Sequence, residues 1–355
     1  MQSVKNKKKT LALKYRPKTF DDLTEQTSIK LILEEQIKTN TFKNGYLFFG
    51  AAGTGKTTSA RIFASMINGG EGRPYEIDAA SNNGVDNVRA IIEQAKTRSL
   101  ETKYKIFILD EVHMFSKGAW NAMLKLLEEP PTNTIFIMCT TEDDNIPATI
   151  LSRVQRYDFN RISFDGIVKR LKHILNYENE EKRYDDDGNF ICDENYYEVD
   201  DEAIEYIAKV ADGGMRDAIT SLDKCLSFNS SLTIKEVTEV LGTVNYSVMF
   251  DITDNIYEQE NMNASLRIQE IYNSGVNLKQ FMRLYRDFLV DVLKYIKTKS
   301  YKDINIPSTY EIPYTTEHYA FIYDLLKSIM AIIAECKKEQ NPRPFIEAAI
   351  ITMEV

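Results

Sequence analysis

The sequence predicts an α/β domain built on a five-stranded parallel sheet, followed by two helical regions. The first 160 residues alternate short apolar, β-branched or aromatic runs with segments of helical periodicity, which is the pattern of a parallel sheet wrapped by helices. After about residue 160 the strand patterns cease, and helical patterns continue along the rest of the chain. The 355 residues are too many for one typical core and favour two or three domains.

Five runs are expected to form the sheet. Runs such as IFIL and IFIM are almost unbroken apolar sequence, which suits strands buried on both faces. Between the strands, apolar residues recur at helical spacing, and the last of these helices is stopped by Pro130 and Pro131. The expected strands span 46–50, 75–78, 104–110, 134–140 and 155–159.

The acidity of the chain is local. The formal net charge is −9, but residues 178–202 hold twelve acids and two bases, which leaves +1 on all other residues together. The first 43 residues lean basic, with ten Lys/Arg against five Asp/Glu. An acidic total therefore does not exclude a nucleic-acid partner.

The cysteines and the apolar runs indicate a protein of the cytoplasm. The four cysteines lie far apart without a CxxC pair, which argues against a zinc module or a disulfide framework. No apolar run approaches the roughly 18–20 residues of a membrane span, and the N-terminal residues lack the apolar core of a signal peptide. We therefore expect cytoplasmic localisation and no membrane partner.

A phosphate-binding motif follows the first expected strand. The run GAAGTGKTT (50–58) fits G-x-x-x-x-G-K-[ST] and opens an expected helix, which is the context the motif requires. Backbone N–H groups of such a loop wrap phosphates, Lys56 would reach the β- and γ-phosphates, and Thr57 would ligate Mg²⁺. The expected nucleotide ligands are Gly50, Ala51, Ala52, Gly53, Thr54, Gly55, Lys56, Thr57 and Thr58.

Two carboxylates follow the third expected strand. Asp110 and Glu111 end the run KIFILDE, at the carboxyl edge of the sheet where α/β folds bind ligands. Asp110 suits the magnesium shell, and Glu111 suits a base that polarises the attacking water. The nearby His113 is interpreted as a packing or hydrogen-bonding residue and is given no part in the chemistry.

Several motifs together resemble one family. The runs LKYRPKTFDDL, EIDAASNNGVDNVR, ILDEVHMFSKGAWNAMLKLLEEPP, TTEDDNIPATILSR and GGMRDAITSLD are similar to the DnaX-type γ/τ subunits of the bacterial clamp loader, which are AAA+ ATPases. The resemblance is dense over residues 11–228 and extends beyond 233 only in layout. It implies an AAA+ nucleotide-binding domain over 1–160, a helical lid over 161–232 with the acidic insert, and a helical collar over 233–355 that assembles subunits.

The resemblance also assigns roles to residues outside the phosphate loop. Tyr15, Arg16 and Pro17 would flank the adenine of ATP. Thr140 or Thr141 would be the residue called sensor 1, between the phosphate and Glu111. The resemblance further makes Arg216 the sensor 2 of the lid, acting on its own chain's nucleotide, and Arg153 an arginine finger that reaches the ATP of the adjacent subunit.

The chain departs from the family pattern at several positions, but none of these departures removes a phosphate ligand. The family usually carries a four-cysteine zinc module before the second strand, whereas residues 68–74 contain no cysteine, so no zinc is expected. Val154 stands where the family has the cysteine of its SRC triplet, and Ala52 where an arginine is often found. The extension that distinguishes τ from γ is also expected to be absent.

The expected partners are other clamp-loader subunits (copies of this chain and δ- or δ′-like subunits), a sliding clamp and primer–template DNA. Arg89, Lys96 and Arg98 would track the DNA backbone, and loop 98–104 is a weaker candidate for touching the clamp. A hairpin is favoured over a calcium loop within 183–194, and its carboxylates should lie outside a DNA channel.

Two alternatives stay open at this point. One is another AAA+ DNA motor of the branch-migration type, which would need a winged-helix end in place of the amphipathic helices after residue 233. The other is a scaffold subunit that does not hydrolyse ATP. Retention of Lys56 and Glu111 counts against the scaffold.

Overall fold

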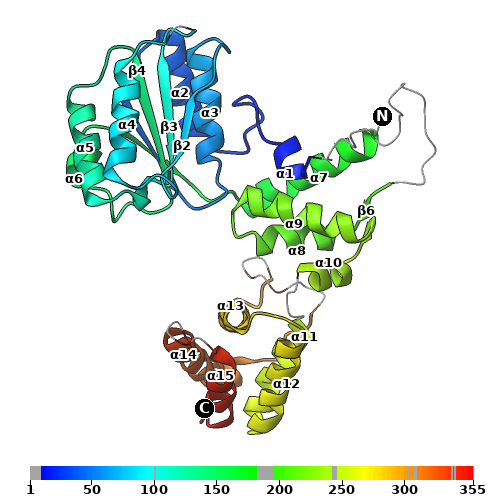
Figure 1. Ribbon diagram of the computed structural model, residues 1–355. Coiled ribbons are helices and arrows are strands. Elements are labelled where there is room, and N and C mark those ends of the chain that lie inside the picture. The colour runs from blue at the N-terminus through cyan, green and yellow to red at the C-terminus, as the bar shows by residue number, and fades with distance from the viewer. Residues whose placement is uncertain are drawn as a thin grey trace, which may run out of the picture. The chain divides into compact units, whose positions relative to one another are not determined.

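The computed structural model describes residues 9–99, 101–181, 196–241, 246–301, 304, 306, 310–336, 339 and 341–354 (Figure 1). The chain divides into two compact units. The first comprises residues 1–196 and 207–223, and the second comprises residues 197–206 and 224–355. The three-domain division expected from the sequence stays a prediction.

The first unit contains a five-stranded sheet in which every pairing is parallel. The strand order is β2-β3-β4-β1-β5, and Leu47 of β1 faces Met138 of β4 on one side and Arg156 of β5 on the other. The expected fold class is therefore confirmed, with each predicted strand within one residue of its bounds. The strands are β1 (Gly45–Gly50), β2 (Tyr75–Asp78), β3 (Lys105–Asp110), β4 (Thr134–Thr140) and β5 (Gln155–Phe159).

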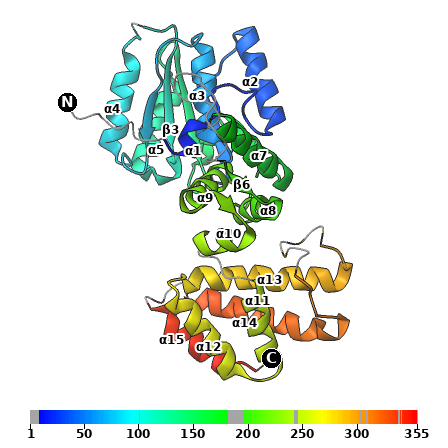
Figure 2. The same cartoon turned by 90° about the vertical axis from the view of Figure 1, so that its right-hand side faces the viewer.

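Helices cover both faces of this sheet (Figure 2). Along β1, the side chains of Tyr46 and Phe48 belong to one apolar cluster and Leu47 to the other, because successive side chains of a strand point to opposite faces. Helices α2 (Thr27–Thr39) and α3 (Lys56–Ile67) pack on the first face, and α4 (Val85–Lys96), α5 (Lys117–Glu128) and α6 (Ala148–Leu151) pack on the second. Burial on both faces accounts for the unbroken apolar runs of β3 and β4.

The helical part of the first unit is held to its N-terminal segment. Helix α1 (Leu11–Lys14) precedes the sheet, and Lys14 Nζ lies 2.7 Å from Glu178 Oε1 of α7 (Phe164–Glu181). The backbone N–H of Leu11 donates to Asp223 Oδ2 of α9 (Met215–Phe228) at 3.0 Å. Helices α8 (Asp201–Val210) and α9 both cross the boundary between the two units.

The second unit is helical around its own core. Phe281 and Tyr285 are among its largest fully buried side chains. In the described part of 246–354 the regular elements are all helices, which fits the expected all-α region. The described residues of this range therefore contain none of the strands that a winged helix needs. The helices are α10 (Ile234–Leu241), α11 (Tyr246–Tyr257), α12 (Asn261–Asn273), α13 (Leu278–Thr298), α14 (Tyr319–Cys336) and α15 (Pro342–Ile351).

One expectation for the helical region was wrong. Strands do not cease after residue 160, because β6 (Glu198–Val199) pairs in parallel with β7 (Ser231–Leu232). Two residues are too few to show a strand period in the sequence. The hairpin expected within 183–194 lies outside the described residues. None of the described helices is long and apolar enough to cross a membrane.

Candidate nucleotide-binding site

A cavity of about 480 Å³ opens in the first unit between the glycine-rich loop, the N-terminal segment and helix α9. Its volume falls within the range of small-molecule sites in proteins. Most residues predicted for nucleotide binding line it, although they come from distant parts of the chain. The lining includes Tyr15, Arg16, Pro17, Ala52, Gly53, Thr54, Gly55, Lys56, Thr57, Thr58, Asp110, Glu111 and Arg216.

The glycine-rich loop is held in a defined shape by its own side chains. Thr54 Oγ1 donates to the carbonyl of Ala51 at 2.8 Å, and Lys56 Nζ donates to the carbonyls of Gly50 and Ala51, both at 2.8 Å. Lys56 is only 6% exposed, and burial lowers the pKa of its amine. A phosphate beside this amine would favour its charged form, because an opposite charge stabilises an ammonium group.

Helix α9 begins directly on the loop. The backbone N–H of Met215 donates to the carbonyl of Gly53 at 3.1 Å. Gly53 has φ +73°, and a Cβ at this position would lie 3.0 Å from Gly214 Cα. A glycine is thus required at 53 both for its backbone conformation and for the close approach of the helix. The following residue, Arg216, is placed in the cavity by this contact.

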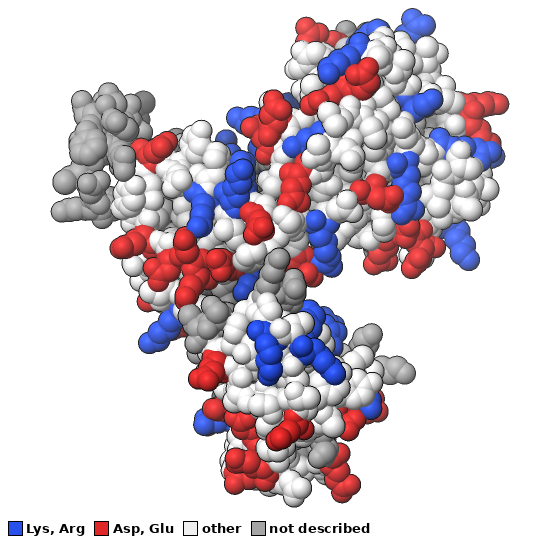
Figure 3. All heavy atoms as spheres, turned by 180° about the vertical axis from the view of Figure 1, so that it is seen from behind, with Lys and Arg blue, Asp and Glu red and all other residues white. Residues whose placement is uncertain are grey.

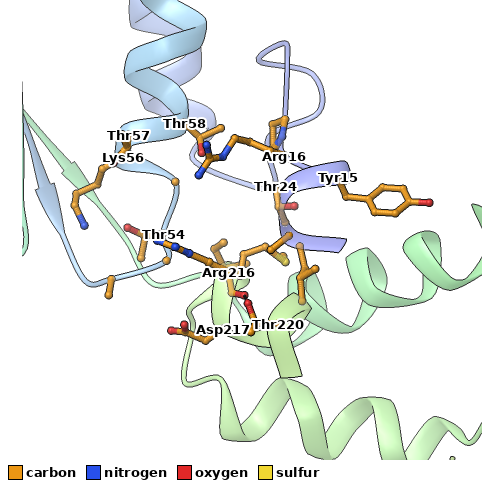
Figure 4. Close-up of a pocket in the computed structure, with 18 of the residues that line it drawn as sticks. Tyr15, Arg16, Thr24, Thr54, Lys56, Thr57, Thr58, Arg216, Asp217 and Thr220 are labelled. Atoms are coloured by element: carbon orange, nitrogen blue, oxygen red, sulfur yellow. Dashed lines mark hydrogen bonds between the residues drawn. The ribbon is translucent and has the colours of Figure 1, made fainter. Parts of the chain in front are cut away.

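Positive charge reaches the cavity from three segments of the chain: Arg16 of the N-terminal segment, Lys56 of α3 and Arg216 of α9. Arg16 extends toward Thr58 and Arg216 toward Thr54, whereas the ring of Tyr15 is directed away from them (Figure 4). Partial burial lowers the pKa of Arg16, and the guanidinium groups of Arg61 and Arg216 lower it further. Guanidinium groups that lie close enough to lower the pKa of Arg16 favour a polyanionic ligand such as a triphosphate.

The two residues predicted to hold magnesium meet at the edge of the sheet. Thr57 Oγ1, in the first turn of α3, donates to Asp110 Oδ2 at the end of β3, at 2.8 Å. Magnesium prefers oxygen ligands and commonly takes one carboxylate, a hydroxyl and phosphate oxygens. The pair therefore fits a magnesium ion. Among the described residues, no cluster of three or more His, Cys, Asp or Glu side chains could hold a metal.

The carboxylate of Glu111 contacts side chains from two neighbouring segments. Thr141 Oγ1 donates to Glu111 Oε2 at 3.3 Å, and His113 Nδ1 lies 3.3 Å from the same oxygen. Glu111 Oε1 has no donor among the described side chains. The arrangement fixes the carboxylate through one oxygen and leaves the other available to accept a hydrogen bond from water.

Thr140 contacts His113 rather than Glu111. The Thr140 hydroxyl donates its one hydrogen to the carbonyl of Glu142 at 2.7 Å, and its oxygen lies 3.1 Å from His113 Nδ1. The hydroxyl can only accept from the imidazole, so Nδ1 carries a hydrogen. Of the two residues predicted as sensor 1, Thr141 touches Glu111 directly and Thr140 fixes the tautomer of His113.

Arg153 does not line the cavity. Its Nη1 donates to the carbonyl of Thr149 at 2.8 Å and to Ser152 Oγ at 3.2 Å, and its Nη2 lies 2.8 Å from Glu128 Oε1 at the end of α5. These contacts occupy three of the five N–H donors of the guanidinium group. The remaining donors, including Nε–H, have no acceptor among the described residues and are available to an external anion.

The residues predicted to contact DNA lie on another surface of the first unit. Arg89 and Lys96 line a groove of about 490 Å³ between α4 and α5, to which Lys125 also contributes, whereas Arg98 does not line it. Arg89 pairs with Asp86 at 3.0 Å, and Lys96 pairs with a glutamate of the same helix. Such exposed pairs contribute little to stability, so both cations can exchange partners.

Some functional candidates were missed by sequence reasoning. His113 was set aside although it touches Glu111, and Glu128 was not singled out although it binds Arg153. Arg170 lines the cavity and donates to the carbonyl of Tyr15 at 3.2 Å. The adjacency of His113 to the DE pair was a usable signal, whereas Glu128 and Arg170 resemble the other charged residues of amphipathic helices.

Comparison with known proteins agrees with the predicted family. A family model described as "DNA polymerase III, delta subunit" matches residues 73–163. The chain is 32% identical to DNA polymerase III subunit tau of Bacillus subtilis (strain 168), over 95% of this chain and 62% of that protein. It is 29% identical to DNA polymerase III subunit gamma of Buchnera aphidicola subsp. Acyrthosiphon pisum (strain APS), over 81% of this chain and 79% of that protein.

The chain belongs to the DnaX-type gamma/tau family of DNA polymerase III subunits. It spans 62%, 53% and 44% of the length of three relatives in this family. A solved structure of the Thermotoga maritima RuvB Holliday junction branch migration motor is also similar, with 18% identity, a TM-score of 0.50 and coverage of 74% of this chain and 86% of that one. At this identity the likeness shows the AAA+ fold alone.

Proposed function

We propose that this gamma/tau-family chain is the ATP-hydrolysing subunit of a clamp loader that opens a sliding clamp and places it on primer–template DNA in the cytoplasm. The observation that carries the proposal is the meeting of the P-loop, the Asp110–Glu111 pair and Arg216 around one cavity. A subunit that served only as a scaffold would not need a buried lysine, a magnesium-type oxygen pair and an oriented carboxylate in one place.

Each group of the cavity has a role in this proposal. Lys56, Arg16 and Arg216 bind the phosphates of ATP, and the segment around Tyr15 and Pro17 borders the adenosine end. Thr57 and Asp110 would hold Mg²⁺, which supplies positive charge to the β- and γ-phosphate oxygens. Glu111, held through Oε2 by the Thr141 hydroxyl, orients the attacking water with Oε1.

Arg153 completes the site of a neighbouring subunit in this proposal. It is absent from its own chain's cavity, yet two of its N–H donors are available to an anion. Charge spreads over the γ-phosphoryl oxygens during hydrolysis, and an arginine supplied to them accelerates the reaction by about 10³–10⁵-fold. Hydrolysis thereby depends on assembly with copies of this chain or with delta- and delta-prime-like subunits.

The remaining parts of the chain serve assembly and DNA. Residues 161–232 act as a lid that carries Arg216 onto the nucleotide, and 233–355 act as the collar that holds subunits together. Arg89 and Lys96, in the α4–α5 groove, and Arg98 track DNA phosphates, which requires shape rather than base sequence. Binding of primer–template DNA aligns Arg153 with the neighbour's ATP, and hydrolysis then releases the closed clamp.

The test is the steady-state ATPase rate of the chain assembled with its partner subunits. We expect clamp and primed DNA together to raise the rate well above the rate with either alone. A branch-migration motor would instead respond to branched DNA without any clamp, and a scaffold would not hydrolyse ATP under any of these conditions. Either result would contradict the proposal.

A further inference from the structure

Helix α13 of the second unit carries a stripe of basic side chains on one face. At 3.6 residues per turn, its five Lys and Arg residues fall within a sector of about 80° and extend over roughly 27 Å. The two acids of the helix lie off this stripe, and Asp291 is buried. The stripe consists of Lys279, Arg283, Arg286, Lys294 and Lys297.

Helix α14 runs alongside this stripe in the opposite direction. At one end, Lys297 Nζ lies 4.2 Å from the centroid of the Tyr319 ring. At the other end, Lys279 and Arg283 border a hollow of about 170 Å³ with Cys336 of α14. The basic stripe therefore contacts α14 near both of its ends.

Aromatic rings lie at the Lys297 end of the basic stripe. The rings of Tyr319 and Tyr323 are parallel within 4°, with centroids 6.4 Å apart, and Tyr323 is 45% exposed. Lys327 Nζ lies 4.2 Å from the Tyr323 ring centroid. We name the five basic residues of α13 together with Tyr319 and Tyr323 the α13–α14 face.

The positive charge of this face is only partly balanced within the chain. Arg286 pairs with Asp287 at 2.6 Å and Lys294 with Asp291 at 3.4 Å. Among the described residues, Lys279, Arg283 and Lys297 have no carboxylate partner, and Lys279 Nζ donates to a backbone carbonyl. Figure 3 shows one face of the second unit, on which basic side chains gather in one part and acidic ones lie elsewhere.

We propose that the α13–α14 face binds single-stranded nucleic acid. A row of cations along one face of a helix can track backbone phosphates, and an exposed ring such as that of Tyr323 can stack on an unpaired base whatever its sequence. A duplex would not use the rings, because its bases already stack on one another, and an acidic peptide would need the charge alone. This site lies in the second unit and does not depend on the proposed nucleotide chemistry.

The test measures binding of the full chain, without nucleotide, to a fluorescent oligothymidylate of about 20 nucleotides. This length exceeds the roughly 4–16 nucleotides that one OB fold covers when it binds a single strand. Arg283→Glu with Lys297→Glu should weaken binding at least ten-fold and lower the salt slope by about 1.4, at about 0.7 per lost phosphate contact. Tyr323→Ala should weaken binding about five-fold or more without changing the slope. Lys224→Glu with Lys235→Glu, an equal charge change on the exposed surface of α9 and α10 in the same unit, is the matched control.

The outcomes separate the possible occupants of this face. Wild-type affinity in both the charge-reversal and the tyrosine variants would overturn the proposal. Loss of binding on charge reversal with no effect of Tyr323→Ala would overturn the preference for single strands, because charge alone would then hold the oligonucleotide. Should charge reversal unfold the protein by circular dichroism, the neutral pair Arg283→Gln and Lys297→Gln should give the same loss of slope.

Discussion

Gly53→Ala probes the contact between the phosphate loop and helix α9. The added Cβ would lie 3.0 Å from Gly214 Cα and 3.2 Å from Gly214 C. These are backbone atoms and cannot rotate away as a side chain could, so the loop and the start of α9 must separate. That separation also lengthens the hydrogen bond from Met215 to Gly53 and withdraws Arg216 from the cavity.

A matched control is available on the same unit. Gly69 has φ +64°, close to the φ of +73° at Gly53, but a Cβ there would meet nothing within 4 Å. Both substitutions should cost about 1–2 kcal/mol for a left-handed alanine. Gly53→Ala alone adds overpacking of about 1–3 kcal/mol. If this overpacking raises the free energy of the nucleotide-bound state alone, the Kd for ATP rises about 5- to 150-fold relative to Gly69→Ala.

The assay is isothermal titration of each variant with a non-hydrolysable ATP analogue and Mg²⁺. On an Arg216→Ala background the additional effect of Gly53→Ala should shrink, because the placement of Arg216 in the cavity, which Gly53→Ala disturbs, no longer contributes. Equal Kd values for Gly53→Ala and Gly69→Ala would refute the inference that the close approach of α9 to the loop supports nucleotide binding.

Three further predictions concern the remaining chemistry. Asp110→Asn removes the charge of the proposed magnesium ligand, so the Mg²⁺ concentration for half-maximal ATP hydrolysis should rise at least ten-fold in a titration, and an unchanged value would exclude Asp110 from that role. Glu128→Ala removes the carboxylate that pairs with Arg153 and should lower the kcat of stimulated hydrolysis about 2- to 5-fold with KM unchanged, because an exposed ion pair contributes little energy. The control Glu129→Ala should leave both kcat and KM unchanged. Burial raises the pKa of Cys225 to about 11, so about one thiol in a thousand is ionised at pH 8. We therefore expect iodoacetamide to label Cys225 in urea but not in the native protein, as measured by peptide mass mapping. Rapid labelling of the native protein would contradict this burial.

The parts of the site that share a local motif were predictable from the sequence. The glycine-rich motif predicted the strand before it and the helix after it. Ligand sites of parallel sheets lie at the carboxyl ends of the strands, which predicted that Asp110 would approach Thr57. The pairs Glu128–Arg153 and His113–Thr140 were not predictable in this way. Their members lie 25 and 27 residues apart and meet only through tertiary packing, which leaves no pattern in the chain.

The packing of helix α9 on the glycine-rich loop was also not predictable from the sequence. Gly53 is an unspecified position of the phosphate-loop motif, and its requirement for glycine comes from Gly214, which is distant in the sequence. The strands β6 and β7 were missed because a two-residue pairing is set by tertiary contacts rather than by residue pattern.

The central proposal is that Arg153 acts on the ATP of a neighbouring subunit. Its most direct test is the ATPase rate of a mixture of Arg153→Ala and Glu111→Gln chains, assembled with clamp and primed DNA. Each variant alone should be almost inactive, and the mixture should recover activity, because some interfaces then join an intact Glu111 to an intact Arg153. An inactive mixture of chains that still assemble with wild type would contradict action in trans.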